Sequence, residues 1–136
     1  MRCTAACVAA LVAAAMPAGA IAAGNPAAGE AVYERCSGCH SLERDRTGPR
    51  HCGLVGRKAG SVEGFAYTEA MKRARIVWTE ATLERFLADP GKVVPGTAMA
   101  AFGVADPRER ADLIAWLALA PPCAGFPLRN GDRLKH

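Results

Sequence analysis

The residues best able to do chemistry are grouped in one short run, CSGCH at residues 36–40. Two thiols separated by two residues can reach both vinyl groups of one porphyrin, and an adjoining imidazole can then ligate the iron. The run therefore predicts one covalently attached haem c, held by Cys36 and Cys39, with His40 as an axial ligand. A redox disulfide usually lies in a βαβ unit and a zinc site needs a second cysteine pair. The sequence indicates neither, because Cys52 stands alone.

An iron bound by His40 has a second axial position. The candidates for it outside the N-terminal leader are Met71, Met99, His51 and His136. Met99 closes the turn PGTAM at residues 95–99, outside any predicted helix, where a thioether can be held pointing inward. Met71 falls in a predicted helix and is interpreted as a gap-filler in the core. Met99 is therefore the favoured ligand, and His51, in a loop after a Gly-Pro turn, is the alternative.

Helical periodicity and capping residues predict the elements that position these groups. A first helix is expected over residues 27–35, directly before the CSGCH run, and a short one over residues 69–74. The residues expected on one side of the first helix are Ala28, Ala31, Val32 and Arg35. No stretch alternates at the period of two that marks a half-buried strand, so an all-α fold is expected.

Two later helices carry clear end signals. Thr79 is the expected N-cap of a helix over residues 80–88. Asp106 is the expected N-cap of a last helix over residues 107–120, with Glu109 completing a capping box. In each case an apolar stripe at helical spacing follows the cap, and a proline ends the pattern.

The segments between these helices, residues 41–66 and 89–105, are long for a small domain and rich in glycine and proline. Loops of that length are expected where they surround a large apolar group at the centre of the molecule. A haem is such a group. The loops therefore support the cofactor that the CSGCH run predicts.

Residues 1–23 have the pattern of a secretory signal peptide: Arg2, a short apolar run and small residues before a cleavage site. The alternative is an uncleaved anchor. Removal leaves residues 24–136 as a single domain in which residues 121–136 form a C-terminal tail. The net charge is then +3, too small for a nucleic-acid binder, and no other stretch is long enough to span a membrane.

Residues 29–119 resemble a class I cytochrome c of the mitochondrial and bacterial c2 type. The stretches that carry the resemblance occur in the family's order and spacing: CSGCH, TGP, GLVGRKAG, GFAYTEAMK, Trp78, PGTAM and ERADLIAWL. They cover about four fifths of the chain after the leader. The resemblance implies the cytochrome c fold, in which the N- and C-terminal helices cross and loops wrap a covalently bound haem.

The resemblance also implies roles for single residues. Cys36 and Cys39 hold the haem, and His40 and Met99 are the axial ligands of its iron. The carbonyl of Pro49 accepts the ring proton of His40. The residues implied to bind or shield the propionates or to line the methionine side are Arg57, Tyr67, Trp78 and Thr97. The residues implied where the first and last helices cross are Gly29, Val32, Leu113, Trp116 and Leu117.

Several positions depart from the family's usual pattern. His51 stands where an apolar residue often faces the porphyrin, Met71 replaces an asparagine, and Phe86 replaces a tyrosine. Drier haem surroundings with fewer hydrogen bonds are expected. Ala98 replaces a lysine and Ala101 a phenylalanine near the exposed haem edge, so the ring of docking cations is thinned. The candidates for a reduced ring are Arg35, Arg46, Lys72, Arg73, Arg75 and Lys92.

The coordination implied by the resemblance leaves no iron position for a substrate, so a one-electron carrier is expected and not an enzyme. We expect a soluble periplasmic monomer without membrane insertion or nucleic-acid partner. Its expected donor is a quinol-oxidising complex of the cytochrome bc1 kind, and its expected acceptor a terminal oxidase or other redox enzyme. Two alternatives remain: a ligand sensor or weak peroxidase with a labile Met99 bond, and a dedicated electron-transfer subunit of one enzyme.

Cys3 and Cys7 are expected to leave with the leader, so Cys52 and Cys123 remain after the haem takes its pair. In an oxidising compartment a disulfide is the default for two such thiols. The resemblance brings the end of the last helix near the loop that carries Cys52, so a bridge across 71 positions is expected. Two separately buried thiols are the alternative.

Overall fold

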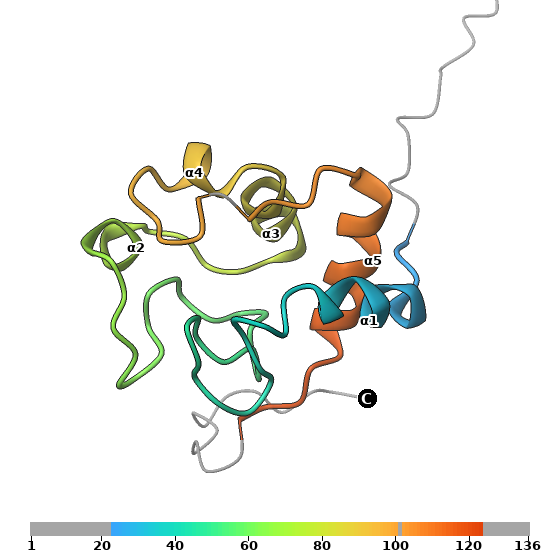
Figure 1. The fold of residues 1–136 in the computed structure, drawn as a ribbon, viewed down its shortest axis with the longest axis horizontal. Coiled ribbons are helices and arrows are strands. Elements are labelled where there is room, and N and C mark those ends of the chain that lie inside the picture. The colour runs from blue at the N-terminus through green and yellow to red at the C-terminus, as the bar shows by residue number, and fades with distance from the viewer. Residues whose placement is uncertain (1–22, 101, 124–136) are drawn as a thin grey trace, which may run out of the picture.

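The computed structural model describes residues 23–100 and 102–123. The helices in these two stretches are α1 (Pro26–Glu34), α2 (Glu69–Arg73), α3 (Glu80–Ala88), α4 (Pro90–Val93) and α5 (Pro107–Ala118). Figure 1 shows α1 and α5 packed across each other on one side, with α2, α3 and α4 on the other. α3 packs directly against α5, and long loops make up much of the rest of the molecule. The expected all-α fold is confirmed, since only an isolated bridge between Lys58 and Val77 occurs in the described residues.

Two of the expected segments lie outside the described residues. They are the signal peptide over residues 1–23, except for its last residue, and the tail from residue 124 onward. Ala101 is also outside them. Within the part of the chain that the structure describes, no helix is both long enough and apolar enough to cross a membrane.

The sequence predicts four of the helices but misses α4. Thr79 caps α3 as expected, and its side chain forms a reciprocal capping box with Thr82. Pro90 signals the end of α3, and the same proline begins α4, because a first helical residue needs no free N–H. The carboxylate of Asp89 accepts a hydrogen bond from the Lys92 N–H at 3.0 Å and caps this short helix.

The crossing of α1 and α5 depends on the missing side chain of Gly29. A Cβ at this position would overlap the Asp112 carbonyl and lie 2.8 Å from the Trp116 Cβ. Close approach of the two backbones buries Val32 and Tyr33 against α5. The rings of Tyr33 and Trp116 lie 4.3 Å apart between centroids.

Two expectations about these helices are wrong. The packed side of α1 holds Gly29, Val32 and Tyr33, whereas Ala31 and Arg35 are exposed. Apolar periodicity misses this face because a glycine packs through its backbone. The Glu109 carboxylate does not complete a capping box at Asp106. It binds the Arg35 guanidinium at 2.7 Å and so links α5 to α1.

A short pairing of loop segments brings the predicted propionate residues together. The Gly56 N–H donates to the Trp78 carbonyl at 2.7 Å, and the Trp78 N–H donates to the Arg57 carbonyl at 2.9 Å. A third bond joins the Ala59 N–H to the Ile76 carbonyl at 2.8 Å. Arg57 and Trp78 are thus neighbours, although they are far apart in the sequence.

Candidate haem site

The CSGCH run forms a tight turn immediately beyond α1. The Cys36 N–H donates to the Tyr33 carbonyl at 2.8 Å, and the His40 N–H donates to the Cys36 carbonyl at 2.9 Å. Cys36 is half-buried and Cys39 is exposed. The turn holds two thiols and an imidazole together, as thioether attachment requires.

The position and hydrogen bonding of the His40 side chain suit it to bind a metal. Its ring is buried, and its Nδ1 lies 2.8 Å from the Pro49 carbonyl oxygen. A carbonyl can only accept, so Nδ1 carries the proton and Nε2 keeps a free lone pair. Burial lowers the pKa of His40, and the hydrogen bond to Pro49 partly opposes that effect. The ring is therefore neutral, which is the form that binds iron.

The backbone at Gly48 lies against the same ring. Its N–H donates to the Cys39 carbonyl at 2.7 Å. A Cβ at Gly48 would overlap the Cε1 atom of His40 and lie 2.6 Å from Nδ1. Sequence reasoning gave Gly48 no role, although its place directly before the proline that binds His40 is the signal that could have identified it.

His51 lies beside His40 rather than across from it. The two rings are stacked with centroids 4.1 Å apart and planes inclined by 24°. Burial, together with the neighbouring His40 and Arg57, holds the pKa of His51 well below its usual range, so this ring is also neutral. A side chain on the same face as His40 is poorly placed to be the opposite ligand, which favours Met99.

The Arg57 guanidinium is half-buried and supports the loop that carries His51. Its Nη1 donates to the Cys52 carbonyl at 2.8 Å, and its Nη2 donates to the Arg50 carbonyl at 2.8 Å. Its Nε is buried and has no hydrogen-bond partner within the described residues. That N–H is available to an anionic group.

The remaining propionate candidates lie in the same region of the fold. Trp78 is buried and its ring lies 4.9 Å from that of Phe86, between centroids. Tyr67 is half-buried, and burial raises the pKa of its hydroxyl, which therefore keeps its proton at neutral pH. Each side chain offers an N–H or O–H donor that a propionate could use.

The methionine side is a turn between α4 and α5. Gly96 has φ of +92°, a conformation that favours glycine and reverses the chain after Pro95. Thr97 is buried, and its N–H donates to the Val94 carbonyl at 2.9 Å. Met99 is half-buried and packs against the core cluster. Met71, the other methionine candidate, is buried within that cluster on α2.

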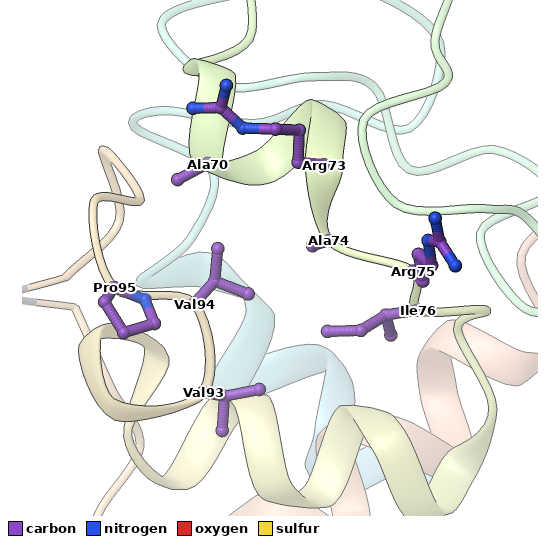
Figure 2. A pocket seen from close by; sticks show the side chains of 8 residues that line it. All are labelled: Ala70, Arg73, Ala74, Arg75, Ile76, Val93, Val94 and Pro95. Carbon is purple, nitrogen blue, oxygen red and sulfur yellow. The ribbon is translucent and has the colours of Figure 1, made fainter.

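A cleft of about 430 Å³ opens between α2 and α4, and Figure 2 shows the eight side chains that line it. Arg73 and Arg75 lie among apolar residues there, and none of the eight is a predicted haem contact.

Two of the other candidate docking cations form ion pairs with acidic side chains. Arg35 binds Glu109 at 2.7 Å and Lys72 binds Glu69 at 3.0 Å. Two of the six candidate docking cations are therefore paired with acidic side chains.

Cys52 and Cys123, the cysteines outside the CSGCH run among the described residues, are joined in the structure. Cys52 and Cys123 form a disulfide with Cα atoms 4.9 Å apart. The Gly53 N–H donates to the Pro121 carbonyl at 2.9 Å next to the bridge. The segment after α5 is thus bound to the loop that carries His51.

These side chains fit a covalently attached haem. Cys36 and Cys39 supply two sulfur atoms for covalent attachment. His40, with one free ring nitrogen, and the Met99 thioether supply candidate iron ligands. The buried Nε–H of Arg57, which has no partner in the described residues, can bind a propionate. Comparison with known proteins agrees, because residues 26–120 match the family described as Cytochrome c. The chain belongs to the cytochrome c family. Haem c, covalently attached, is therefore its cofactor, and electron transfer is the role that its family supports.

Individual relatives are similar over most of the chain. Over 99 residues it is 46% identical to cytochrome c2 of Rhodomicrobium vannielii, covering 71% of this chain and 79% of that protein. Over 102 residues it is 43% identical to cytochrome c of Chlamydomonas reinhardtii, covering 72% and 91%. The solved structure of cytochrome cH from Methylobacterium extorquens matches with a TM-score of 0.68 at 43% identity, covering 70% of this chain and 98% of that one.

Proposed function

We propose that this cytochrome is a periplasmic one-electron shuttle. Its donor is a quinol-oxidising complex of the cytochrome bc1 kind, and its acceptor is a terminal oxidase or another redox enzyme. The observation that carries the proposal is the neutral, buried His40 imidazole with its Nδ1 occupied by Pro49. A signal peptide over residues 1–23 would deliver the chain to that compartment.

Haem c supplies a one-electron couple between Fe(II) and Fe(III) when it is bound. In this proposal His40 and Met99 would both hold the haem iron, which would leave no place on it for a substrate. Arg57, Tyr67 and Trp78 bind or shield the propionates, and Thr97 lines the methionine side. A methionine ligand and a buried site both favour the reduced iron, which suits a carrier of high potential.

Docking to an acidic partner is proposed through a mildly basic surface. The charge of the chain after the leader is only +3, and two of the six candidate cations are paired with acidic side chains. Reaction rates with an acidic partner should therefore fall as ionic strength rises, with a shallow slope. Rates that rise with salt would contradict a positive docking surface.

Optical spectra of the purified holoprotein in both redox states test the proposal. A shuttle should show covalent haem c, a methionine–iron band in the oxidised form, and no carbon monoxide binding to the reduced form at neutral pH. Carbon monoxide binding by the unmodified protein would favour a ligand sensor or peroxidase. Co-purification with one enzyme at high salt would favour a dedicated subunit. The mass of the exported holoprotein should correspond to a chain that starts at Ala23 or Gly24.

A further inference from the structure

His51 is half-buried beside the proposed haem ligand His40 but has no role in the proposed chemistry. Its ring stacks on that of His40, with centroids 4.1 Å apart and planes inclined by 24°. Its Nδ1 is buried and has no hydrogen-bond partner in the part of the chain that the structure describes. An unpartnered buried nitrogen lowers stability, so packing alone does not account for a histidine at this position.

The backbone around His51 is held from several directions. The His51 N–H donates to the Ser41 carbonyl at 2.9 Å, and the Cys52 N–H donates to the Leu42 carbonyl at 2.8 Å. The two carbonyls that flank His51, those of residues 50 and 52, both accept from the Arg57 guanidinium at 2.8 Å. The disulfide to Cys123 anchors the next residue, with a Cα separation of 4.9 Å. The backbone that bears the His51 ring is therefore held firmly in place.

We propose that His51 is a positioning residue that fixes the rotation of the His40 imidazole about its bond to the haem iron. The inference rests on the proposed axial role of His40. The His51 ring is supported by the backbone that carries it. That backbone is held by Arg57, by the hydrogen bonds to residues 41 and 42, and by the Cys52–Cys123 disulfide.

The Pro49 hydrogen bond alone does not fix that rotation tightly. A carbonyl oxygen accepts over a broad range of directions, so the ring can turn while the bond to Nδ1 persists. A flat ring stacked at 4.1 Å restricts this movement, because any turn brings ring atoms into overlap. Groups beyond the metal's own ligands commonly orient those ligands and tune the metal in this way.

The orientation of an axial imidazole can be measured directly. In a ferric low-spin haem, the imidazole plane determines how unpaired spin is distributed over the four pyrroles. The spread of the haem methyl NMR shifts reports this distribution. The proposal therefore has a readout that does not depend on electron-transfer activity.

Two substitutions separate stacking from simple packing. His51→Leu removes the flat ring and the partnerless nitrogen, whereas His51→Phe removes the nitrogens and keeps a flat aromatic ring, which is somewhat larger. We expect His51→Leu to change the spread of the methyl shifts and the reduction potential without lowering the unfolding temperature. We expect His51→Phe to keep the parent pattern. Ile114→Val is the matched control, because Ile114 is buried on α5.

The possible outcomes separate this proposal from the proposed function. If the parent spectra show His–Met ligation but His51→Leu keeps the parent methyl pattern, or both variants change it, the positioning role is wrong and the shuttle stands. If the parent lacks His–Met ligation, the proposed function itself fails. Should His51→Leu not mature, NMR of the reduced parent still decides. Through-space contacts between the ring protons of His51 and His40 are expected, and their absence would overturn the inference.

Discussion

The two sides of the haem site are restrained very differently. On the His40 side, the ligand ring is held by the Pro49 carbonyl and the His51 stack, and the supporting loop by Arg57 and a disulfide. On the Met99 side, the residue packs against the core cluster and the described hydrogen bonds are those of a turn. The Met99 N–H donates to the Thr97 hydroxyl at 3.3 Å, and the Phe102 N–H donates to the Met99 carbonyl at 3.0 Å.

This difference indicates where the site will open first. Local opening starts in segments with few buried contacts and few strong restraints. The chain around Met99 depends on a Pro-Gly turn, on the bonds within that turn, and on a bond from the Val104 N–H to the Leu87 carbonyl at 2.7 Å. Ligand exchange at the iron should therefore begin with Met99, while His40 keeps its place.

Removing the less restrained ligand should have the largest effect on the iron. Met99→Ala leaves the two thioether bonds intact, so the haem should remain attached. The reduction potential should fall, and carbon monoxide binding by the reduced protein should rise from none to stoichiometric at neutral pH. Optical spectroscopy and potentiometry check this. An unchanged spectrum and potential would mean that Met99 is not the ligand, and Met71 or His51 would be tested next.

Removing the disulfide tests the stronger restraint on the His40 side. Cys52→Ser combined with Cys123→Ser opens a loop spanning 71 positions, and the free energy of unfolding should fall by about 4 kcal/mol at most. Denaturant unfolding of the holoprotein measures the loss, and the methionine–iron band should be unchanged. Thiol titration of the unfolded, unreduced parent should find no reactive thiol; two would contradict the bridge.

A substitution at Gly48 disturbs the same side through the ligand itself. In Gly48→Ala, the new methyl group overlaps the His40 ring, so either the ring or the loop must move. Overpacking of this kind lowers the free energy of unfolding by about 3 kcal/mol. Gly38→Ala is the matched control within the CSGCH run, since a Cβ there has no neighbour within 4 Å. Equal unfolding curves for the two variants would show that Gly48 does not touch His40.

The sequence predicts the helices better than it predicts the contacts that support the candidate ligands. The CSGCH run and the caps at Thr79 and Asp106 are local patterns, and the helices follow them. The contact of Gly48 with His40 and the stack of His51 on the same ring arise only when distant loops meet. Glu109 illustrates the same limit, because its partner Arg35 lies 74 positions away and replaces the local bond that its spacing suggests.

The smallest expected change concerns Tyr33, which lies between α5 and the His51 loop. Its hydroxyl is buried without a partner in the described residues, whereas its ring packs against that of Trp116 in a tilted arrangement with centroids 4.3 Å apart. Tyr33→Phe keeps the ring and removes the unsatisfied group, so the free energy of unfolding should rise by about 1 kcal/mol. Tyr33→Leu, the control, also removes the ring packing and should be less stable than the parent.

The parent and Tyr33→Phe should also differ in how their free energies of unfolding change at alkaline pH. Burial raises the pKa of Tyr33 from 10.0 to about 12. The unfolded chain therefore loses this proton at lower pH than the folded one, and the parent should lose stability as pH rises from about 10 to 12. The fall attributable to Tyr33 should be absent in Tyr33→Phe, measured by denaturant unfolding across that range. If parent and variant lose stability in parallel, the Tyr33 hydroxyl is not buried against the His51 loop, and the restraint of the His40 side does not extend to it.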